Sequence, residues 1–212
     1  MPSRNLRLLA DAERVRDALT ALRAELKVPE EFPADVRAAA EKSAALVKRP
    51  DLDRTEVPFV TIDPADSMDL DQAVHVARSG SGFVVQYAIA DVAAFVDPGG
   101  VVNAEAHRRG QTFYGPDARS ALHPPELSEA AASLLPGQER PALVWELNLD
   151  SAGELIDAAV RRARVRSRAK LSYQEVQHDL DAGTAGEMLS LLPVIGGLRQ
   201  ERERARGGVS LP

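Results

Sequence analysis

Cysteine is absent from the 212-residue sequence. Its absence excludes a disulfide framework and a cysteine-ligated zinc site, and it fits a reducing compartment. No stretch approaches the roughly 18 uninterrupted apolar residues of a membrane-spanning helix, and the N-terminal segment MPSRNLRLLADAER lacks the apolar core of a signal peptide. We therefore expect a soluble, cytoplasmic protein with no membrane partner.

Aromatic residues are scarce, at 4% of the chain, whereas 44% of the residues are hydrophobic. Aliphatic side chains must therefore fill the core, and the length suits one domain of ordinary size with room for a small second unit. A basic surplus is also missing, since the net charge is −6. This argues against a general nucleic-acid coat protein, but it leaves room for an enzyme that gathers its cations along one path.

The first 50 residues have the pattern of two helices. Apolar residues recur at helical spacing over residues 5–27, and Pro29 cannot continue that helix. An Ala-rich second helix is expected from Pro33 to Val47, followed by a linker at residues 49–51. Such a unit is either a helix-turn-helix-like nucleic-acid binder or a two-helix cap on the main domain. The cap is favoured, because no basic recognition face stands out.

Carboxylates crowd the stretch that follows the β-branched run Phe59–Ile62, which reads as a strand. Pro64 prevents that strand from continuing. Like charges this close raise one another's pKa and oppose folding unless a cation or hydrogen-bond donors compensate. Oxygen ligands without sulfur or imidazole suit Mg²⁺ or Mn²⁺ better than Zn²⁺, so the pattern favours metal-dependent phosphate chemistry. The four carboxylates are Asp63, Asp66, Asp69 and Asp71.

The acidic loop has two other interpretations. A calcium loop of EF-hand type needs a Glu at its twelfth position, but counting from Asp63 gives Val74 and counting from Asp69 gives Gly80. A simple solvated loop stays open, although it fits poorly between two apolar strand-like runs.

Behind the loop, the sequence predicts a hairpin of residues 73–77 and 83–90, turning at residues 80–82. Asp91 ends its second strand and is expected to cap the turn that follows. Helices are expected at residues 101–110 and 128–135. A strand pair follows at residues 142–149 and 155–165, then a helix from Ser172. A last helix at residues 186–205 is expected to break around Pro193.

Cations alternate with small or apolar residues from Arg162 to Lys170, a pattern we call the basic row. At the period of a strand, all of its members share one face. Such a row repels itself, so it predicts either an anionic partner, with RNA the natural choice beside a metal site, or opposing carboxylates in a salt-bridged surface strand. The row comprises Arg162, Arg164, Arg166, Arg168 and Lys170.

Five ordered blocks carry a resemblance to a known family. They are TIDPADSMDLDQAV (61–74), YAIADVAAFV (87–96), HRRGQTFYGP (107–116), LHPPELSEAAASLLPGQERPAL (122–143) and RAKLSYQEVQ (168–177). In this order they resemble the RNase II/RNase R (RNB-domain) exoribonucleases, from about Asp51 to the end of the sequence. One acidic motif would be weak support, whereas five blocks in one order make chance similarity improbable.

The resemblance implies an α+β fold, with a mixed or antiparallel sheet in the N-terminal part of an RNB catalytic domain over residues 51–212, after a helical unit over residues 1–50. It implies a hydrolytic 3′-to-5′ exoribonuclease that uses Mg²⁺, or Mn²⁺, to degrade single-stranded RNA to nucleoside 5′-monophosphates. Asp63, Asp69 and Asp71 match the first three acidic positions of the family motif and are the expected catalytic residues and metal ligands. Gln72 stands where many members have a fourth Asp, so it is an uncharged ligand.

The resemblance also implies RNA contacts. Tyr114 and Tyr173 match aromatic positions that contact the 3′-terminal nucleotides, and Arg164, Arg166, Arg168 and Lys170 are the expected backbone contacts. The OB-type domains that usually flank the family's catalytic domain do not fit the leader. Because the family's domain continues beyond this point, we expect the remainder of the RNB domain as a partner, in the same polypeptide before cleavage or as a separate chain. The alternative is a catalytically impaired RNB-fold module that binds RNA, which Gln72 favours.

Overall fold

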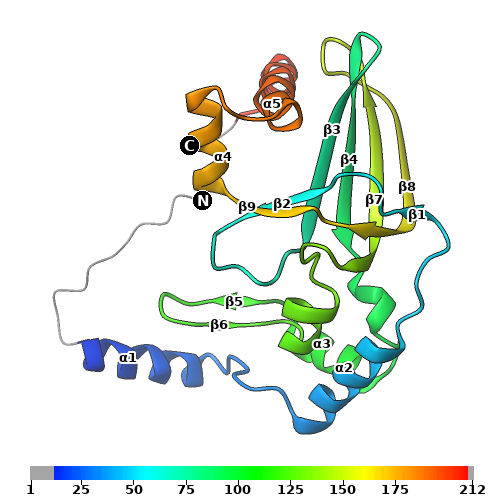
Figure 1. The fold of residues 1–212 in the computed structure, drawn as a ribbon. Coiled ribbons are helices and arrows are strands. Elements are labelled where there is room, and N and C mark those ends of the chain that lie inside the picture. The colour runs from blue at the N-terminus through cyan, green and yellow to red at the C-terminus, as the bar shows by residue number, and fades with distance from the viewer. Residues whose placement is uncertain (1–11, 210–212) are drawn as a thin grey trace.

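The computed structural model describes residues 12–209, whose centre is a strongly curled sheet of seven strands in the order β1-β8-β7-β4-β3-β2-β9 (Figure 1). The strands are β1 (Asp53–Arg54), β2 (Val60–Asp63), β3 (Gln72–Ser79), β4 (Gly82–Ala90), β7 (Glu139–Leu149), β8 (Leu155–Arg166) and β9 (Ala169–Ser172). Pairing is antiparallel from β2 through β8, whereas β1 joins β8, and β9 joins β2, in parallel. The expected α+β fold with a mixed sheet is confirmed.

Helices and one small hairpin complete the fold. The helices are α1 (Ala12–Glu25), α2 (Ala34–Leu46), α3 (Val101–Arg109), α4 (Tyr173–Ala182) and α5 (Glu187–Ala205), with the short helical turns η1 (Val92–Phe95) and η2 (Glu126–Ala131). The hairpin pairs β5 (Phe113–Tyr114) with β6 (Arg119–Ser120). No helix in residues 12–209 combines the length and the apolar character needed to cross a membrane.

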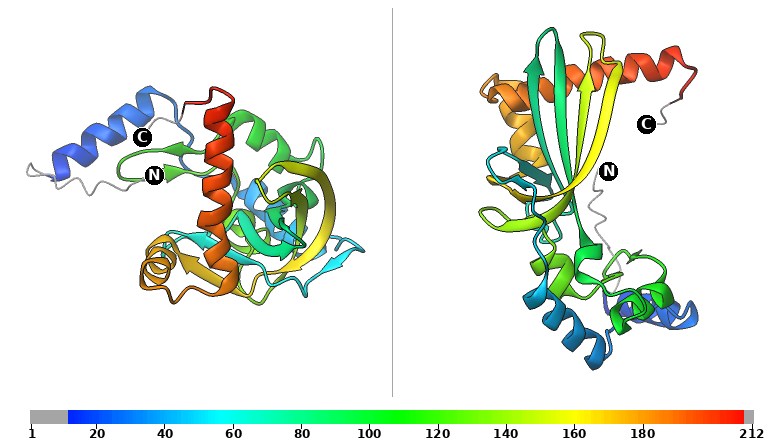
Figure 2. Two further views of the ribbon diagram at one scale, coloured as in Figure 1. Left: turned by 90° about the horizontal axis from the view of Figure 1, so that it is seen from above. Right: turned by 90° about the vertical axis from the view of Figure 1, so that its right-hand side faces the viewer.

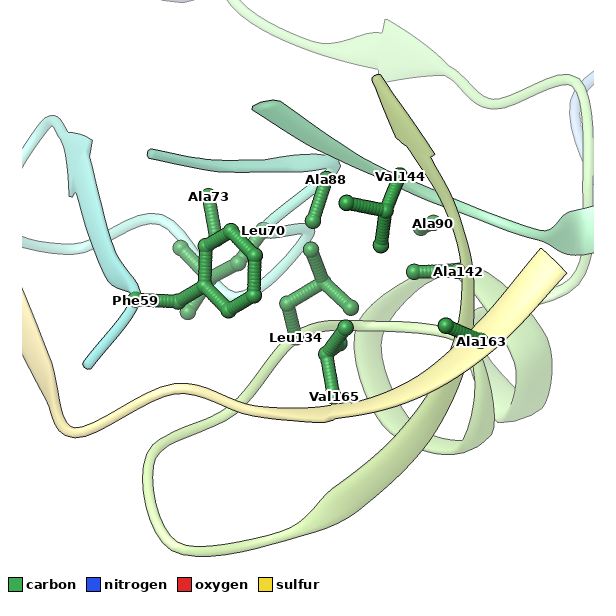
Figure 3. Close-up of a cluster of buried hydrophobic side chains, with 10 residues drawn as sticks. All are labelled: Phe59, Leu70, Ala73, Ala88, Ala90, Leu134, Ala142, Val144, Ala163 and Val165. Carbon is green, nitrogen blue, oxygen red and sulfur yellow. The ribbon is translucent and has the colours of Figure 1, made fainter. Parts of the chain in front are cut away.

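The main core lies on the inner face of the curl (Figure 3). The strands contribute mostly small residues there, including Ala73, Ala88 and Ala163, which leaves space for Phe59 and Leu70 from the chain around the acidic loop. Both of these large side chains are fully buried. Truncating either to Ala would cost about 2–5 kcal/mol of stability by leaving a cavity. The acidic loop is therefore attached to the core by its own apolar residues.

Helix α5 crosses the other face of the sheet (Figure 2). Its Leu191 and Ile195 pack on Val76 and Phe83. The expected break around Pro193 is wrong, because α5 runs unbroken through it. Leu191 and Ile195 are buried on either side of the exposed proline, so packing on the sheet maintains the helix where local propensity would end it.

A second, smaller core lies among the helical elements at the end of β4. Val36 and Ala40 of α2 are buried with Phe95, Val102 and Leu127, so α2 shares a core with η1, α3 and η2. By contrast, α1 buries no side chain in its described part. The expected helix at residues 128–135 is wrong in its bounds, since η2 ends at Ala131 and the next residues turn back toward the acidic loop.

Candidate active site

The acidic loop joins β2 to β3, since Asp63 is the last residue of β2 and Gln72 is the first of β3. Leu70, near its end, is fixed at several points. Its N–H donates to Ser133 Oγ at 3.0 Å, its C=O accepts from the N–H of Leu134 at 2.9 Å, and its side chain is buried. Ser133 Oγ also donates to the C=O of Met68 at 2.6 Å. Asp69 and Asp71, on either side of Leu70, are therefore held by an anchored backbone.

Lys170 holds the first half of the loop. It lies on β9, opposite Thr61 of β2, and its Nζ donates to the C=O of Ala65 at 2.8 Å and to the C=O of Ser67 at 2.5 Å. Its charge also partly opposes the rise in the pKa of Asp63. The sequence predicts that Lys170 contacts RNA. In the structure its ammonium group binds backbone carbonyls of the loop that carries the carboxylates.

The three expected catalytic carboxylates lie within electrostatic reach of one another. Desolvation first, and then the charge of Asp69, raise the pKa of Asp63. Desolvation, followed by the charges of Asp69 and Asp63, raises the pKa of Asp71, which Arg119 opposes. Burial and the neighbouring carboxylates therefore both disfavour the charged forms of Asp63 and Asp71. Such a site favours the arrival of a cation.

Arg119 of β6 is the cation that touches this cluster directly. Its Nη1 lies 2.5 Å from Asp69 Oδ2, and its Nη2 lies 2.5 Å from Glu129 Oε1. The guanidinium therefore bridges a carboxylate of the acidic loop and one of η2. Sequence reasoning missed Arg119, which is 50 residues from Asp69 along the chain.

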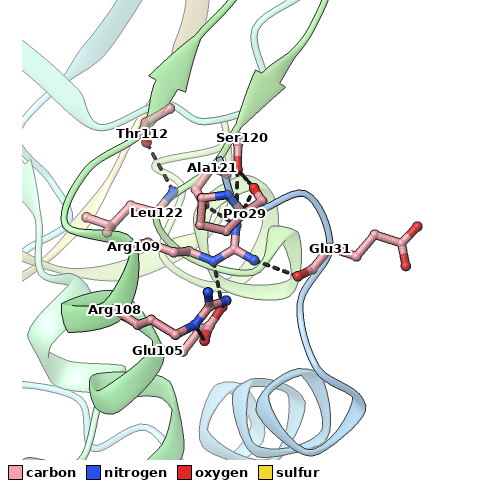
Figure 4. Close-up of polar contacts among 9 residues, drawn as sticks. All are labelled: Pro29, Glu31, Glu105, Arg108, Arg109, Thr112, Ser120, Ala121 and Leu122. Atoms are coloured by element: carbon pink, nitrogen blue, oxygen red, sulfur yellow. Dashed lines mark hydrogen bonds and ion pairs between the residues drawn. The ribbon is translucent and has the colours of Figure 1, made fainter. Parts of the chain in front are cut away.

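The hairpin that carries Arg119 is fixed by Arg109, whose side chain is fully buried (Figure 4). Arg109 donates to Glu105 Oε1 at 2.7 Å, to Ser120 Oγ at 3.2 Å and to the C=O of Glu31 at 2.6 Å, and its guanidinium lies 3.6 Å from the ring centre of Phe32. This network joins α3, β6 and the segment before α2. It holds β5 and β6 beside the acidic loop (Figure 1).

The two expected RNA-contacting tyrosines lie on different elements near the cluster. Tyr114 pairs with Arg119 across the hairpin, is 79% exposed, and lines a pocket of about 310 Å³ together with Asp69 and Asp71. Tyr173 is 56% exposed and begins α4, directly after Ser172, the register partner of Asp63. Both rings thus offer open faces near the carboxylates.

Tyr87 of β4 lies within electrostatic reach of both Asp63 and Tyr173, and the sequence analysis assigned it no role. Desolvation, then the charges of Asp63 and Tyr173, raise its pKa. Its hydroxyl therefore lies in the same electrostatic neighbourhood as the acidic loop and the start of α4. Tyr87 pairs with Val74 of β3 in a register that alternation along the chain does not specify.

The basic row is not one continuous strand, which corrects that part of the sequence-based expectation. β8 ends at Arg166 and pairs with β7, whereas β9 begins at Ala169 and pairs with β2. Protein oxygens face every cation of the row. The nearest partners are Asp91 for Arg162, Asp53 for Arg164, Glu139 for Arg166, the C=O of Thr55 for Arg168, and the C=O groups of Ala65 and Ser67 for Lys170. Contact of these side chains with RNA stays a prediction.

Asp91 is structural in a different way from the one expected. Its side chain caps no N–H of η1. Instead, its Oδ2 accepts from Arg162 Nε at 2.8 Å, and the residue is only 2% exposed. The carboxylate that ends β4 therefore binds the first cation of the basic row and lies outside the acidic cluster.

The donor set of the acidic loop fits a hard divalent cation in its chemistry, although it is not a finished cage. Among residues 12–209, no three Asp, Glu or His side chains are arranged as a ready-made metal site. Mg²⁺ does not need one, because it is commonly held by one or two carboxylates together with waters and substrate phosphates. Desolvation first, and then the neighbouring carboxylate charges, raise the pKa of Asp63 and of Asp71, and a bound cation would oppose both shifts. Gln72 is exposed and makes no hydrogen bond to these carboxylates.

Comparison with known proteins places the chain in a family. A model of the RNB domain matches residues 49–212. Ribonuclease R of Mycoplasma pneumoniae is 36% identical over 168 residues, which are 75% of this chain and 23% of that protein. Exoribonuclease 2 of Photorhabdus laumondii is 39% identical over 132 residues, which are 61% of this chain and 20% of that protein.

The fold agrees with these matches. The apo form of Mycoplasma genitalium RNase R superposes with a TM-score of 0.85 at 26% identity, covering 98% of this chain and 34% of that one. The chain thus spans about a third or less of the relatives it matches. Because the family match extends over residues 49–212, this chain belongs to the RNB-domain family.

Proposed function

We propose that this chain forms part of a hydrolytic 3′-to-5′ exoribonuclease that degrades single-stranded RNA to nucleoside 5′-monophosphates with the help of a divalent cation. One observation carries the proposal. Asp63 and Asp71 have raised pKa values in a cluster with Asp69, and two exposed tyrosines lie near it. A site short of positive charge and bordered by aromatic faces suits a metal ion and the end of an RNA strand.

The tyrosines would supply binding without sequence preference. Tyr114 lines the pocket that contains Asp69 and Asp71, and its exposed ring can stack on a base. Tyr173 presents a second ring at the start of α4. Stacking contributes about 1–3 kcal/mol per base and tolerates any base, as a non-specific exonuclease requires.

Asp63, Asp69 and Asp71, with Gln72 beside them, would hold Mg²⁺ or Mn²⁺. When bound, such an ion supplies charge stabilisation at a phosphate and lowers the pKa of a coordinated water. The protein's own part is to position the carboxylates through Leu70, Ser133 and Lys170. Gln72 offers an amide oxygen without negative charge, which weakens the attraction for a cation compared with a fourth Asp.

An RNA-binding module with impaired hydrolysis is the second candidate. Two observations favour it: Gln72 in place of a carboxylate, and Arg119, which already neutralises Asp69. Both lower the net negative charge available to a metal ion. This candidate predicts RNA binding without release of mononucleotides.

Incubation with uniformly labelled poly(A) separates the two candidates. We expect Mg²⁺-dependent release of nucleoside 5′-monophosphates that stops with a chelator. Asp71→Asn should lower hydrolysis by about 10²-fold or more while RNA binding persists, because the lost charge acts on the transition state. Asp157→Asn, a matched change at an exposed position of β8, should leave both unchanged. RNA binding without any mononucleotide release would favour the second candidate.

A further inference from the structure

Arg119 lies between two hollows and takes part in both. On one side is the pocket lined by Asp69, Asp71 and Tyr114. On the other is a second hollow of about 310 Å³, lined by Asp66, Asp69 and Glu129. Because Arg119 and Asp69 line both spaces, their ion pair forms the partition between them. The guanidinium therefore has room to move without repacking of the core.

The contacts of this guanidinium are divided between two carboxylates with different surroundings. Asp69 belongs to the crowded acidic loop, where its charge raises the pKa of Asp63 and of Asp71. Glu129 belongs to η2, outside the loop. The side chains of Arg119, Asp69 and Glu129 are 36%, 27% and 34% exposed, so both pairs are partly open to water. Each pair is therefore weak enough to exchange.

Arg119 and a divalent cation would compete for the same oxygen. Asp69 Oδ2 lies 2.5 Å from Arg119 Nη1, so this oxygen cannot coordinate an ion at full strength while the pair persists. The positive charge of the guanidinium would also repel an ion held by Asp63 and Asp71. Glu129 Oε1, which already contacts Nη2, offers a place where the guanidinium stays paired after it leaves Asp69.

We propose that Arg119 is a built-in counter-ion of Asp69 that a divalent cation must displace, with Glu129 retaining the displaced guanidinium. The inference rests on the proposed binding of a divalent cation by the acidic loop. Arg119 acts through Asp69 and is a positioning residue. In the metal-free protein it lowers the repulsion within the loop, and it thereby weakens the affinity for the cation.

The test is the affinity for Mn²⁺, measured by electron paramagnetic resonance of the free ion in a titration without RNA. A partly exposed ion pair contributes up to about 1 kcal/mol, which is about fivefold in affinity, so Arg119→Gln should tighten Mn²⁺ binding by about two- to fivefold. Arg119→Lys keeps the charge but cannot bridge both carboxylates, so its Mn²⁺ affinity should lie between those of the unchanged protein and Arg119→Gln. If Arg119→Gln does not fold, the Mn²⁺ affinity of Arg119→Lys tests the inference.

Arg37→Gln is the matched control. It removes the same charge from a partly exposed ion pair with Glu126, which includes no residue of the acidic loop. Its Mn²⁺ affinity should equal that of the unchanged protein. Glu129→Gln should weaken Mn²⁺ binding in the presence of Arg119, and it should do so by much less in the Arg119→Gln background, because the guanidinium that would return to Asp69 is then missing.

The outcomes separate this inference from the proposed function. If the chain binds Mn²⁺ in a way that Asp71→Asn abolishes, but Arg119→Gln changes the affinity no more than Arg37→Gln does, the counter-ion role is wrong and the proposed metal use stands. If Glu129→Gln changes the Mn²⁺ affinity equally in both backgrounds, Glu129 acts only as a distant charge and does not retain the guanidinium. If Mn²⁺ does not bind, or binds regardless of Asp71, the inference and the proposed metal use both fail.

Discussion

The acidic loop and the basic row each concentrate charge of one sign, and the structure compensates them unequally. Each cation of the row faces an oxygen from Asp53, Asp91, Glu139 or a backbone carbonyl. Among residues 12–209, Asp69 is the only carboxylate of the loop with an ion pair to a side chain, and the pKa values of Asp63 and Asp71 remain raised. One cluster is neutralised by the fold, and the other retains excess charge.

This difference separates two sequence patterns of similar charge density. Four carboxylates fall within residues 63–71 and five cations within residues 162–170, so charge density alone does not separate the two. What separates them is where distant segments place opposite charges. The paired charges of the basic row stabilise the place where β8, β1 and β9 meet. The excess negative charge of the acidic loop would attract a cation from solution.

Within the basic row, replacing Arg162 should cause the largest loss of stability, because its partner Asp91 is buried. Asp91 is 2% exposed, and Arg162 Nε is the donor to its Oδ2, while its Oδ1 has no hydrogen-bond partner in the described structure. Arg162→Gln should therefore destabilise the fold by about 1–3 kcal/mol in urea unfolding, the cost of a buried charged group left without its donor. Arg161→Gln, the adjacent exposed arginine on the opposite face of β8, should cost far less. Equal losses of unfolding free energy in the two variants would show that the ion pair between Arg162 and Asp91 does not stabilise the fold.

Sequence reasoning placed the elements whose signals are local. The strand that ends at Asp63, the hairpin β3–β4, the pair β7–β8 and the start of α4 at Ser172 agree with the structure. Each depends on strand alternation, a glycine turn or a helix cap within a few residues. Ser172, for example, accepts from the N–H of Glu175 in a capping box. Such signals need no information from distant parts of the chain.

The partners of the site could not be obtained in this way. Arg119 lies on a two-residue strand, and the buried network of Arg109 helps to hold that strand beside Asp69. Ser133 reads as the end of a helix, yet it holds the backbone of Leu70. The break between Arg166 and Ala169 arises because β9 leaves β8 to pair with β2, which alternation alone cannot indicate. These contacts depend on tertiary packing, which propensity does not encode.

A smaller effect is expected when the middle of the basic row is removed. Each cation that neutralises a phosphate of single-stranded RNA contributes about 0.7 to the slope of log affinity against log salt. Because Asp53, Glu139 and the C=O of Thr55 already face them, the triple change of Arg164, Arg166 and Arg168 to Ala should lower the slope by much less than three such contacts would. Fluorescence titration of labelled poly(A) at several salt concentrations measures this slope. A fall by the full amount would restore the sequence-based assignment of the row to RNA binding.

The smallest effect is a pH dependence that belongs to the acidic loop. The pKa of Asp71 is raised above the value of about 3.9 of a free aspartate, so between these two values the folded state binds more protons than the unfolded state. Its contribution to stability therefore falls as pH rises through that window and stays low above it. Asp71 is open to solvent, which limits the effect to about 1 kcal/mol or less. Depressed carboxyl pKa values elsewhere, such as that of Glu105, act in the opposite direction, so the measurement must be the difference in stability between the unchanged chain and a variant.

In urea unfolding from acid to neutral pH, Asp71→Asn should gain stability relative to the unchanged chain as pH rises. Mg²⁺ at neutral pH should raise the melting temperature of the unchanged chain more than that of the variant, because bound cation removes the repulsion. Parallel stability curves for the two proteins would mean that the loop carries no excess charge, and the contrast with the basic row would fail.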